Sequence, residues 1–264
     1  MSLDKKDLQI IECLDTNCRM RVTQIAKKVA LSSENVRQRI SKLAAKEIFK
    51  KFTLICDGAK LGYSCYAIHY QYSSITTAEE RELLRYLHKQ PYTISLTETE
   101  GTFDLFHLAL FFFFFIALQE IGVFLRHYGR NIINRRVDTV TSIWRSPSLF
   151  LGLERSAKGI HIDFAQKGSF KIDGLDKAIL TQLSEDSRTS LLSIAKDQRT
   201  TASKVRYRLR RLEQDGIIAG YTTTFHLQTA NFLSVNISVL LKNPQRANIL
   251  EAFLIEHPHV LYIY

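Results

Sequence analysis

The sequence predicts an α+β fold in which two winged helix-turn-helix domains alternate with two ferredoxin-like (βαββαβ) domains, the second of them incomplete. Three observations support this prediction: a long internal repeat, apolar residues at helical spacing in each copy, and alternating runs typical of strands. The chain has 264 residues, and 45% of them are hydrophobic, which favours folded cores over disorder. At about 100–200 residues per domain, this length holds about two domains or four small modules.

The repeat has an offset of 169 residues and needs no gap over residues 4–53. Pairs that are identical in the two copies include Asp4/Asp173, Asp7/Asp176, Ile10/Ile179, Leu14/Leu183, Arg19/Arg188, Ile25/Ile194, Val36/Val205, Arg37/Arg206, Arg39/Arg208, Leu43/Leu212 and Thr53/Thr222. Chance does not produce so dense a match without a gap. We therefore interpret the chain as two copies of one module.

The first copy begins with three predicted helices. Asp4 is a good N-cap for the first helix, and Asn17 ends it. A short helix over residues 23–28 follows, and Ser32 is a good N-cap for the third helix. Two helices joined by a tight turn are typical of a helix-turn-helix.

Two alternating runs follow these helices, at residues 48–55 and 64–72. We expect them to form two strands joined as a hairpin, which would be the wing of a winged helix-turn-helix domain. The second copy is expected to repeat this arrangement.

The third helix of each copy has one apolar and one polar face. Val36, Ile40 and Leu43 face the core in the first copy, and basic and polar residues lie opposite. Arginine can bond guanine edges or phosphates, and glutamine can bond adenine. The candidate DNA contacts are Ser33, Glu34, Arg37, Gln38, Ser41, Lys42, Lys50, Lys51, Ser203, Lys204, Arg206, Tyr207, Arg210 and Arg211. The alternative is a solvated basic helix face without a ligand.

Arg39 and Arg208 lie at the edge of the core face of these helices. We predict a structural role for them, either in ion pairs with first-helix carboxylates such as Asp7 and Asp176 or in clamping a phosphate.

The net charge of +10 also indicates a polyanionic partner, most often nucleic acid and sometimes a membrane surface. The longest apolar run, residues 105–118, is shorter than the ~20 residues that span a bilayer. Together with a polar start, it predicts a cytoplasmic protein without a membrane partner. Cysteines at positions 13, 18, 56 and 65 have no zinc-like spacing, so we expect buried or partly buried thiols, no metal and no cofactor.

The region between the copies predicts one ferredoxin-like domain. The expected elements are a strand over residues 65–72, a helix over 76–90, strands over 92–100 and 103–113, a helix over 117–128 and a strand over 137–144. The second copy repeats only a strand over 232–241, a helix over 245–257 and a strand over 258–264. The second domain is therefore expected to lack two strands and a helix. The expected boundaries are 1–55, 56–146, 147–171 for a connector, 172–224 and 225–264.

Several segments together resemble one known family. They are LDKKDLQIIECL, IAKKVALSSENVRQRISKLAAKEI, TLICDGAKLGY and EGTFDL in the first copy, and IDGLDKAILTQL and IAKDQRTTASKVRYRLRRLEQDGIIAGYT in the second. This sequence is similar to the Lrp/AsnC, or feast/famine, family of prokaryotic transcription regulators. The resemblance implies a sequence-specific regulator of double-stranded DNA, with recognition helices over 33–45 and 202–214.

The resemblance also implies a ferredoxin-like domain that self-associates and binds an amino acid or a related small effector. The matching G-x-x-D pattern points to Thr99, Gly101 and Asp104 as the effector region. The family usually has one pair of domains per chain, whereas this sequence has two, and Glu47 replaces a glycine that Gly216 keeps. We expect the two ferredoxin-like modules to pack sheet to sheet as a pseudo-dimer within one chain.

Two other functions fit the same architecture. Siroheme decarboxylases resemble this pattern, some of them as tandem fusions, and carry His- and Arg-containing motifs after the second strand of the ferredoxin-like domain. Here that stretch offers only His107, and we interpret His69 and His107 as core or interface residues, so we predict no enzyme. An interaction module that does not bind DNA is the third interpretation.

Overall fold

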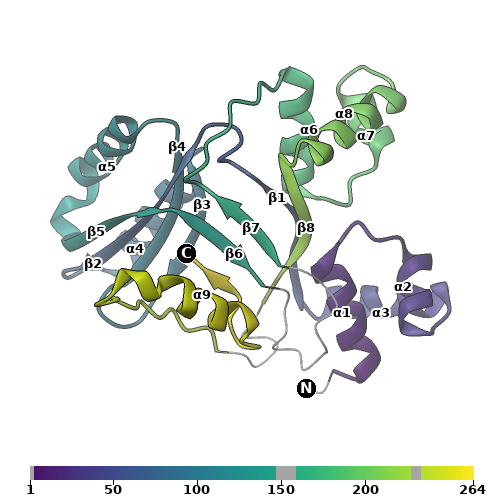
Figure 1. Ribbon diagram of the computed structural model, residues 1–264, viewed down its shortest axis with the longest axis horizontal. Helices are drawn as coiled ribbons and strands as arrows, with labels where there is room; N and C mark the ends of the chain where they lie inside the picture. Colours follow the sequence, from purple (N-terminus) through teal and green to yellow (C-terminus); the bar gives the residue numbers. More distant parts are fainter. Residues whose placement is uncertain (1–2, 147–158, 227–232) are drawn as a thin grey trace. The chain divides into compact units, whose positions relative to one another are not determined.

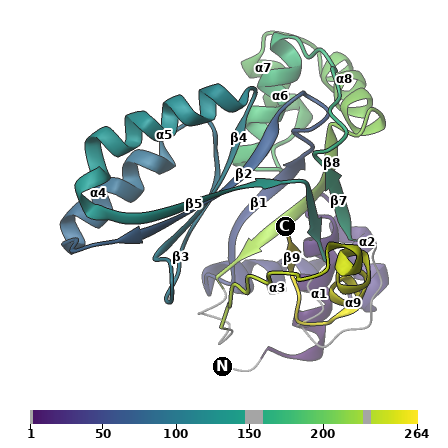
Figure 2. The ribbon, with the colours of Figure 1, turned by 60° about the vertical axis from the view of Figure 1, so that its left-hand side comes forward.

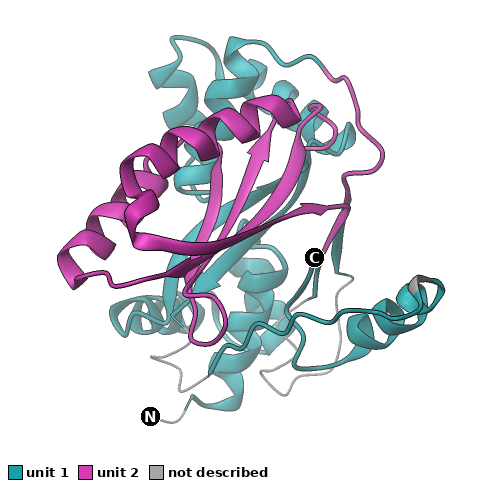
Figure 3. Cartoon of the chain, turned by 90° about the vertical axis from the view of Figure 1, so that its left-hand side faces the viewer, with its two compact units in different colours: residues 1–57, 144–161, 171–263 teal, residues 58–143, 162–170, 264 magenta. Residues whose placement is uncertain are grey.

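The computed structural model describes residues 3–146, 159–226 and 233–264. The chain divides into two compact units (Figure 3). Unit 1 contains residues 1–57, 144–161 and 171–263, and unit 2 contains residues 58–143, 162–170 and Tyr264. Both helix-turn-helix domains therefore belong to unit 1, and the first ferredoxin-like domain is unit 2.

Each helix-turn-helix domain has the three helices that the sequence predicts. They are α1 (Lys5–Thr16), α2 (Val22–Val29) and α3 (Ser33–Ala45) in the first copy, and α6 (Gly174–Glu185), α7 (Leu191–Asp197) and α8 (Ala202–Gln214) in the second. The helices predicted over 33–45 and 202–214 are present as α3 and α8. Residue 47 and residue 216 follow them with φ of 54° and 68°, so Glu47 adopts the left-handed conformation of its glycine counterpart.

Side-chain caps begin these helices where the sequence places them. The Asp4 carboxylate accepts a hydrogen bond from the Asp7 amide at 2.8 Å, and Ser32 Oγ accepts one from the Asn35 amide at 3.1 Å. Asn17 ends α1, as predicted. Fully buried apolar residues hold the helices together; they are Ile10, Leu14, Ile25 and Val36 in the first domain and Ile179, Leu183, Ile194 and Val205 in the second.

The predicted wing hairpin is wrong. The strand β1 (Phe49–Cys56) pairs antiparallel with β8 (Ile218–Phe225) from the second copy, and not with β2 (Ser64–Tyr72) (Figure 1). The physical reason is that β2 has no free edge, because β4 and β5 bond to its two sides. A strand can form only two ladders, so β1 pairs elsewhere.

Unit 2 has the expected ferredoxin-like order. Its elements are β2, α4 (Thr77–His88), β3 (Thr93–Glu98), β4 (Leu105–Phe111), α5 (Phe114–Tyr128), η1 (Gly129–Asn131) and β5 (Ile132–Val140). The antiparallel sheet has the order β3-β4-β2-β5, and α4 and α5 cover one of its faces (Figure 2). The strand predicted over 137–144 is in fact two strands, since β5 ends at Val140 and β6 (Ser142–Arg145) follows.

His107 lies in this sheet as the core residue that the sequence predicts, with 1% of its surface exposed. Its Nε2 atom lies 3.0 Å from Thr93 Oγ1, and burial lowers its pKa from 6.5 to about 4. The imidazole is therefore neutral at pH 7.

Acid is expected to destabilise the protein through His107. The unfolded chain takes up a proton near pH 6.5 and the folded chain only near pH 4, so stability falls as the pH drops between these values. The loss should approach about 3 kcal/mol at pH 4. Urea unfolding of wild type and of the His107→Phe variant at several pH values measures it, and an equal pH dependence of the two proteins would contradict this expectation.

The second copy forms less regular structure than predicted. A helix, α9 (Ala247–Glu256), a short strand, β9 (Tyr262–Ile263), and a 3-10 turn, η3 (Pro244–Arg246), are present, but residues 233–241 form no strand. The equivalent strand β2 is held by two neighbours, and nothing in the described part of the chain pairs with 233–241. A lone strand without a ladder is not stable. Phe232, which begins the predicted strand, lies outside the described residues.

The predicted connector, 147–171, falls only partly within the described residues, since 147–158 lie outside them. Its remainder includes a strand that the sequence did not predict, β7 (Ile160–Asp163), in a small sheet of order β7-β6-β9.

The four cysteines are free thiols, as predicted. Cys13, Cys18 and Cys65 are buried and Cys56 is partly buried. Burial raises the pKa of Cys56 to about 11 and that of Cys65 to about 12, so both stay protonated and unreactive at pH 7. In the described ranges, no helix has the length and apolar character needed to cross a membrane.

Candidate nucleic-acid interface

Contacts between the two copies in unit 1 occur in matched pairs. The Cys18 amide donates to the Tyr221 carbonyl at 3.4 Å, and the equivalent Ser187 amide donates to the Phe52 carbonyl at 3.1 Å. Each residue of the second contact is the 169-residue counterpart of one in the first. Each helix-turn-helix domain therefore contacts the other copy through equivalent residues, as the two halves of a symmetric dimer do.

Two side-chain contacts follow the same relation. Thr222 Oγ1 donates to the Asp15 carbonyl at 3.0 Å, and Thr53 Oγ1 donates to the Ser184 carbonyl at 3.2 Å. Thr53 and Thr222 are direct partners in the β1–β8 ladder and are counterparts in the repeat. A pseudo-two-fold axis therefore passes through this threonine pair.

Two arginines that are counterparts in the repeat, Arg19 and Arg188, also make matched contacts. The Arg19 guanidinium lies 5.4 Å from the ring centre of Tyr221, and Arg188 lies 5.3 Å from that of Phe52. Each arginine packs on the strand of the other copy, which stabilises the pairing by cation–π attraction. The Arg19/Arg188 identity in the sequence did not indicate this role, because identity alone does not show which strand the two side chains meet.

The candidate DNA contacts gather on the outer faces of α3 and α8. All are exposed except Ser33 and Arg211, which are partly exposed. Those on α3 are Ser33, Glu34, Arg37, Gln38, Ser41 and Lys42, and those on α8 are Ser203, Lys204, Arg206, Tyr207, Arg210 and Arg211. Lys50 and Lys51 lie on β1, so they belong to the ladder between the copies rather than to a hairpin wing.

Ion pairs differ between the two recognition helices. Arg37 Nη1 lies 3.1 Å from Glu34 Oε2, and Arg211 Nε lies 3.5 Å from Asp215 Oδ2. Arg206 has no carboxylate partner among the residues that the structure describes.

The predicted ion pairs of Arg39 and Arg208 are confirmed. Arg39 Nη1 lies 2.6 Å from Asp7 Oδ1 and 2.7 Å from Asp4 Oδ2. The second copy has the equivalent ion pairs: Arg208 Nη1 lies 2.7 Å from Asp173 Oδ2 and 3.1 Å from Asp176 Oδ2. These arginines tie each recognition helix to the first helix of its domain. They orient the helix and leave the outer face to other residues.

Replacing Arg39 by alanine is expected to lower the free energy of unfolding by about 1 kcal/mol, since the ion pairs are partly exposed. The hydrogen bond from Arg39 lowers the pKa of Asp4 below 3.8, so this contribution is present above that pH and is lost below it. Urea unfolding at pH 7 and pH 3 measures it, with Arg37→Ala as the matched control on the same helix. A changed base preference in Arg39→Ala would contradict the structural role.

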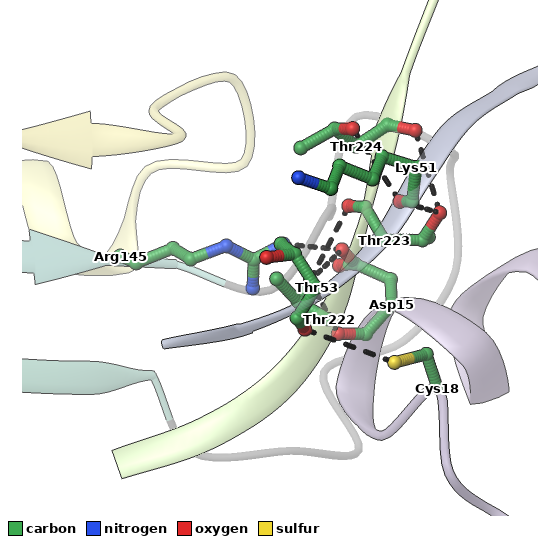
Figure 4. Close-up of polar contacts among 8 residues, drawn as sticks. All are labelled: Asp15, Cys18, Lys51, Thr53, Arg145, Thr222, Thr223 and Thr224. Atoms are coloured by element: carbon green, nitrogen blue, oxygen red, sulfur yellow. Dashed lines mark hydrogen bonds and ion pairs between the residues drawn. The ribbon is translucent and has the colours of Figure 1, made fainter. Parts of the chain in front are cut away.

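A buried polar cluster joins the first copy to β6 and β8 (Figure 4). Asp15 is 1% exposed and forms an ion pair with Arg145, and the Thr222 hydroxyl lies 3.1 Å from its Oδ1 atom, so this hydroxyl shares its proton between the Asp15 carbonyl and carboxylate. The counterpart of Asp15 in the second copy is Ser184, so this ion pair breaks the two-fold symmetry. The sequence did not point to it, because Asp15 and Arg145 lie far apart in the chain.

The predicted effector residues lie together at the turn between β3 and β4. The Asp104 carboxylate accepts a hydrogen bond from the Tyr72 amide at 2.6 Å, and its carbonyl accepts one from the Thr99 amide at 2.8 Å. Gly101 has φ of 143°, a conformation that favours glycine, and a Cβ there would meet open space. Asp104 therefore fixes the end of β2, and Gly101 forms the turn.

The paired recognition helices and their frame define a DNA-binding protein of the helix-turn-helix class. Residues 3–44 match the family described as the AsnC-type helix-turn-helix domain, and residues 172–219 match winged helix-turn-helix DNA-binding. The HTH-type transcriptional regulator FL11 of Pyrococcus horikoshii is 31% identical over 103 residues, which are 39% of this chain and 67% of that protein. The chain belongs to the Lrp/AsnC family of DNA-binding transcription regulators.

Two further comparisons cover more of the chain. The HTH-type transcriptional regulator Ptr1 of Methanocaldococcus jannaschii is 26% identical over 144 residues, which are 54% of this chain and 93% of that protein. The crystal structure of the siroheme decarboxylase NirDL is similar with a TM-score of 0.53 at 13% identity, over 83% of this chain and 65% of that one. At this identity the likeness to NirDL is one of fold.

Proposed function

We propose that one chain binds two half-sites of double-stranded DNA, one with α3 and one with α8, and regulates transcription in the cytoplasm. The observation that carries this proposal is the β1–β8 ladder with its matched contacts, which joins two recognition helices within one unit. In helix-turn-helix proteins, two such helices read half-sites about one helical turn apart or multiples of it. The contacts we assign to DNA are the α3 and α8 residues described above, with Lys50 and Lys51 on phosphates.

The selected operator is expected to be non-palindromic. Gln38 on α3 and Tyr207 on α8 occupy equivalent exposed positions, and so do Ser41 and Arg210. Different side chains at equivalent positions bond different base edges, so the two half-sites should differ. Selection of bound sequences from a random DNA pool tests this directly. A strictly palindromic selected site would contradict two-headed reading by one chain, and no enriched site would overturn sequence-specific binding.

We further propose that an amino acid or a related effector binds near Thr99, Gly101 and Asp104. The G-x-x-D pattern at residues 101–104 supports this assignment. Titration calorimetry of the full chain with the twenty amino acids, with Asp104→Ala as the variant, tests it. Binding that the variant retains unchanged would place the effector elsewhere.

The ferredoxin-like domains are also proposed to mediate self-association, within one chain or between chains. Light scattering at several protein concentrations tests this. A mass of one chain at all concentrations would exclude association between chains.

The second candidate function is that of a siroheme decarboxylase-like enzyme, which the fold of NirDL favours. We propose that this chain is not such an enzyme, because the ring of its candidate histidine, His107, is almost completely buried. Mixing the purified protein with siroheme and recording the visible spectrum separates the two functions. A bound-haem spectrum, followed by conversion of siroheme, would favour the enzyme.

A further inference from the structure

The first turns of α3 and α8 differ in one charge. Glu34 on α3 is the counterpart of Ser203 on α8, and the arginine one turn later, Arg37 or Arg206, is common to both. All four residues are exposed on the outer faces of their helices. The two helices therefore present the same arginine, with a carboxylate beside it only in the first.

In the first copy this carboxylate holds the arginine. Glu34 Oε2 lies 3.1 Å from Arg37 Nη1, with 67% and 59% of the two side chains exposed. Bidentate reading of guanine needs two donors of one guanidinium group, aimed at O6 and N7. Glu34 accepts from Nη1 of Arg37, one of the three guanidinium nitrogens that carry these donors.

The ion pair alone would not prevent this reading. An exposed ion pair of this kind changes an equilibrium constant by at most about fivefold. A good bidentate contact to a base changes the binding constant by more than that. The stronger obstacle is the carboxylate itself, which would remain near O6 and N7 after the pair breaks. Both guanine atoms are acceptors, so a carboxylate repels them, whereas it accepts hydrogen bonds from cytosine N4.

We infer that Glu34 is a specificity determinant that prevents Arg37 from reading guanine, so that α3 reads adenine through Gln38 while α8 reads guanine through Arg206. Arg37 then contacts only phosphate. This inference rests on the proposed function, since it assigns the base preference of each half-site. The operator becomes one half-site with adenine and one with guanine at equivalent positions.

Reciprocal exchange at the two equivalent positions tests the inference. Binding sites are selected from a random double-stranded DNA pool with full-length wild type, Glu34→Ser, Ser203→Glu, Arg37→Ala and Arg206→Ala. Compared with wild type, the Arg206→Ala variant should lose the guanine preference and bind the best wild-type site about 5- to 150-fold more weakly. Arg37→Ala should weaken all sequences alike, by less than about tenfold, because it removes a phosphate contact.

The exchanged variants should change the base and not only the affinity. Glu34→Ser should create a guanine preference in the α3 half-site, which the added Arg37→Ala substitution removes. Ser203→Glu should remove guanine from the α8 half-site. Glu82→Ser, an equal charge change on an exposed residue of α4, is the control and should select the wild-type site.

Two results would overturn the inference while leaving the proposed function intact. One is an enriched wild-type site whose bases change with Arg37→Ala. The other is a Glu34→Ser variant that selects the same site as wild type. A failure of every protein to enrich any sequence would overturn the proposed function itself, and the inference with it.

Discussion

Raising the salt concentration from 50 to 200 mM is expected to weaken DNA binding about 10³-fold if about six phosphates are contacted. The physical reason is the release of counterions from DNA, which gives a log–log slope of about −0.9 for each phosphate neutralised. The basic residues proposed for these contacts are Arg37, Lys42, Lys50, Lys51, Arg210 and Arg211. Fluorescence anisotropy with a labelled operator over a salt series measures the slope.

Variants make this expectation specific to the proposed surface. Lys42→Ala and Lys50→Ala should each reduce the slope by about 0.9. Arg39→Ala should leave the slope unchanged, since Arg39 is held by Asp4 and Asp7. An affinity that does not change with salt would favour the interaction module that does not bind DNA.

Replacing Asp15 by alanine is expected to lower the free energy of unfolding of the protein by about 3–5 kcal/mol. The substitution would leave the Arg145 guanidinium buried beside β8 without its carboxylate, and its side chain is only 11% exposed. An uncompensated buried charge costs several kcal/mol, more than the ion pair contributes when both partners are present. Urea or thermal unfolding of the full chain, followed by circular dichroism, measures the loss.

Two comparisons isolate the ion pair from other effects of the substitution. Ser184→Ala changes the counterpart position in the second copy, which has no such arginine, and should cost less than about 0.5 kcal/mol. The double variant Asp15→Leu/Arg145→Leu should be more stable than Asp15→Ala, because no charge remains buried. A double variant that is less stable than Asp15→Ala would contradict this explanation.

Local patterns in the sequence predicted the parts of the fold that local forces determine. Asp4 and Ser32 cap their helices where their positions indicate, and the spacing of residues such as Val36 and Leu43 identifies the buried faces. The ion pairs of Arg39 and Arg208 were also predictable, because the arginines lie at the edge of the core face and the acidic residues recur with the repeat.

Pairing between distant segments could not be predicted in the same way. The alternation in residues 49–56 indicates a strand but not its partner, and the nearest strand along the chain, β2, turned out to be occupied on both edges. The Thr53/Thr222 identity gave no usable signal, because the repeat contains many identical pairs and identity does not show which pair lies at the two-fold axis. The repeat gives no signal for Asp15 and Arg145 either. The counterpart of Asp15 is Ser184, and Arg145 lies outside the repeated residues.

The candidate interface shows the same limit. The sequence identified which residues of α3 and α8 face outward, because the helical period fixes it. It placed Lys50 and Lys51 on a wing, whereas they lie on a ladder between the two copies. It also treated Arg37 and Arg206 as equivalent, and only the contact with Glu34 distinguishes them.

The number of chains on one operator tests the central claim most directly. Native mass spectrometry of the full chain, 30.4 kDa, with a selected DNA that holds one pair of half-sites gives this ratio. We expect one chain for each pair of half-sites, and association between chains keeps this ratio, because every added chain brings two more recognition helices. Two chains on one pair of half-sites, each protecting a single half-site in footprinting, would contradict reading by two helices of one chain.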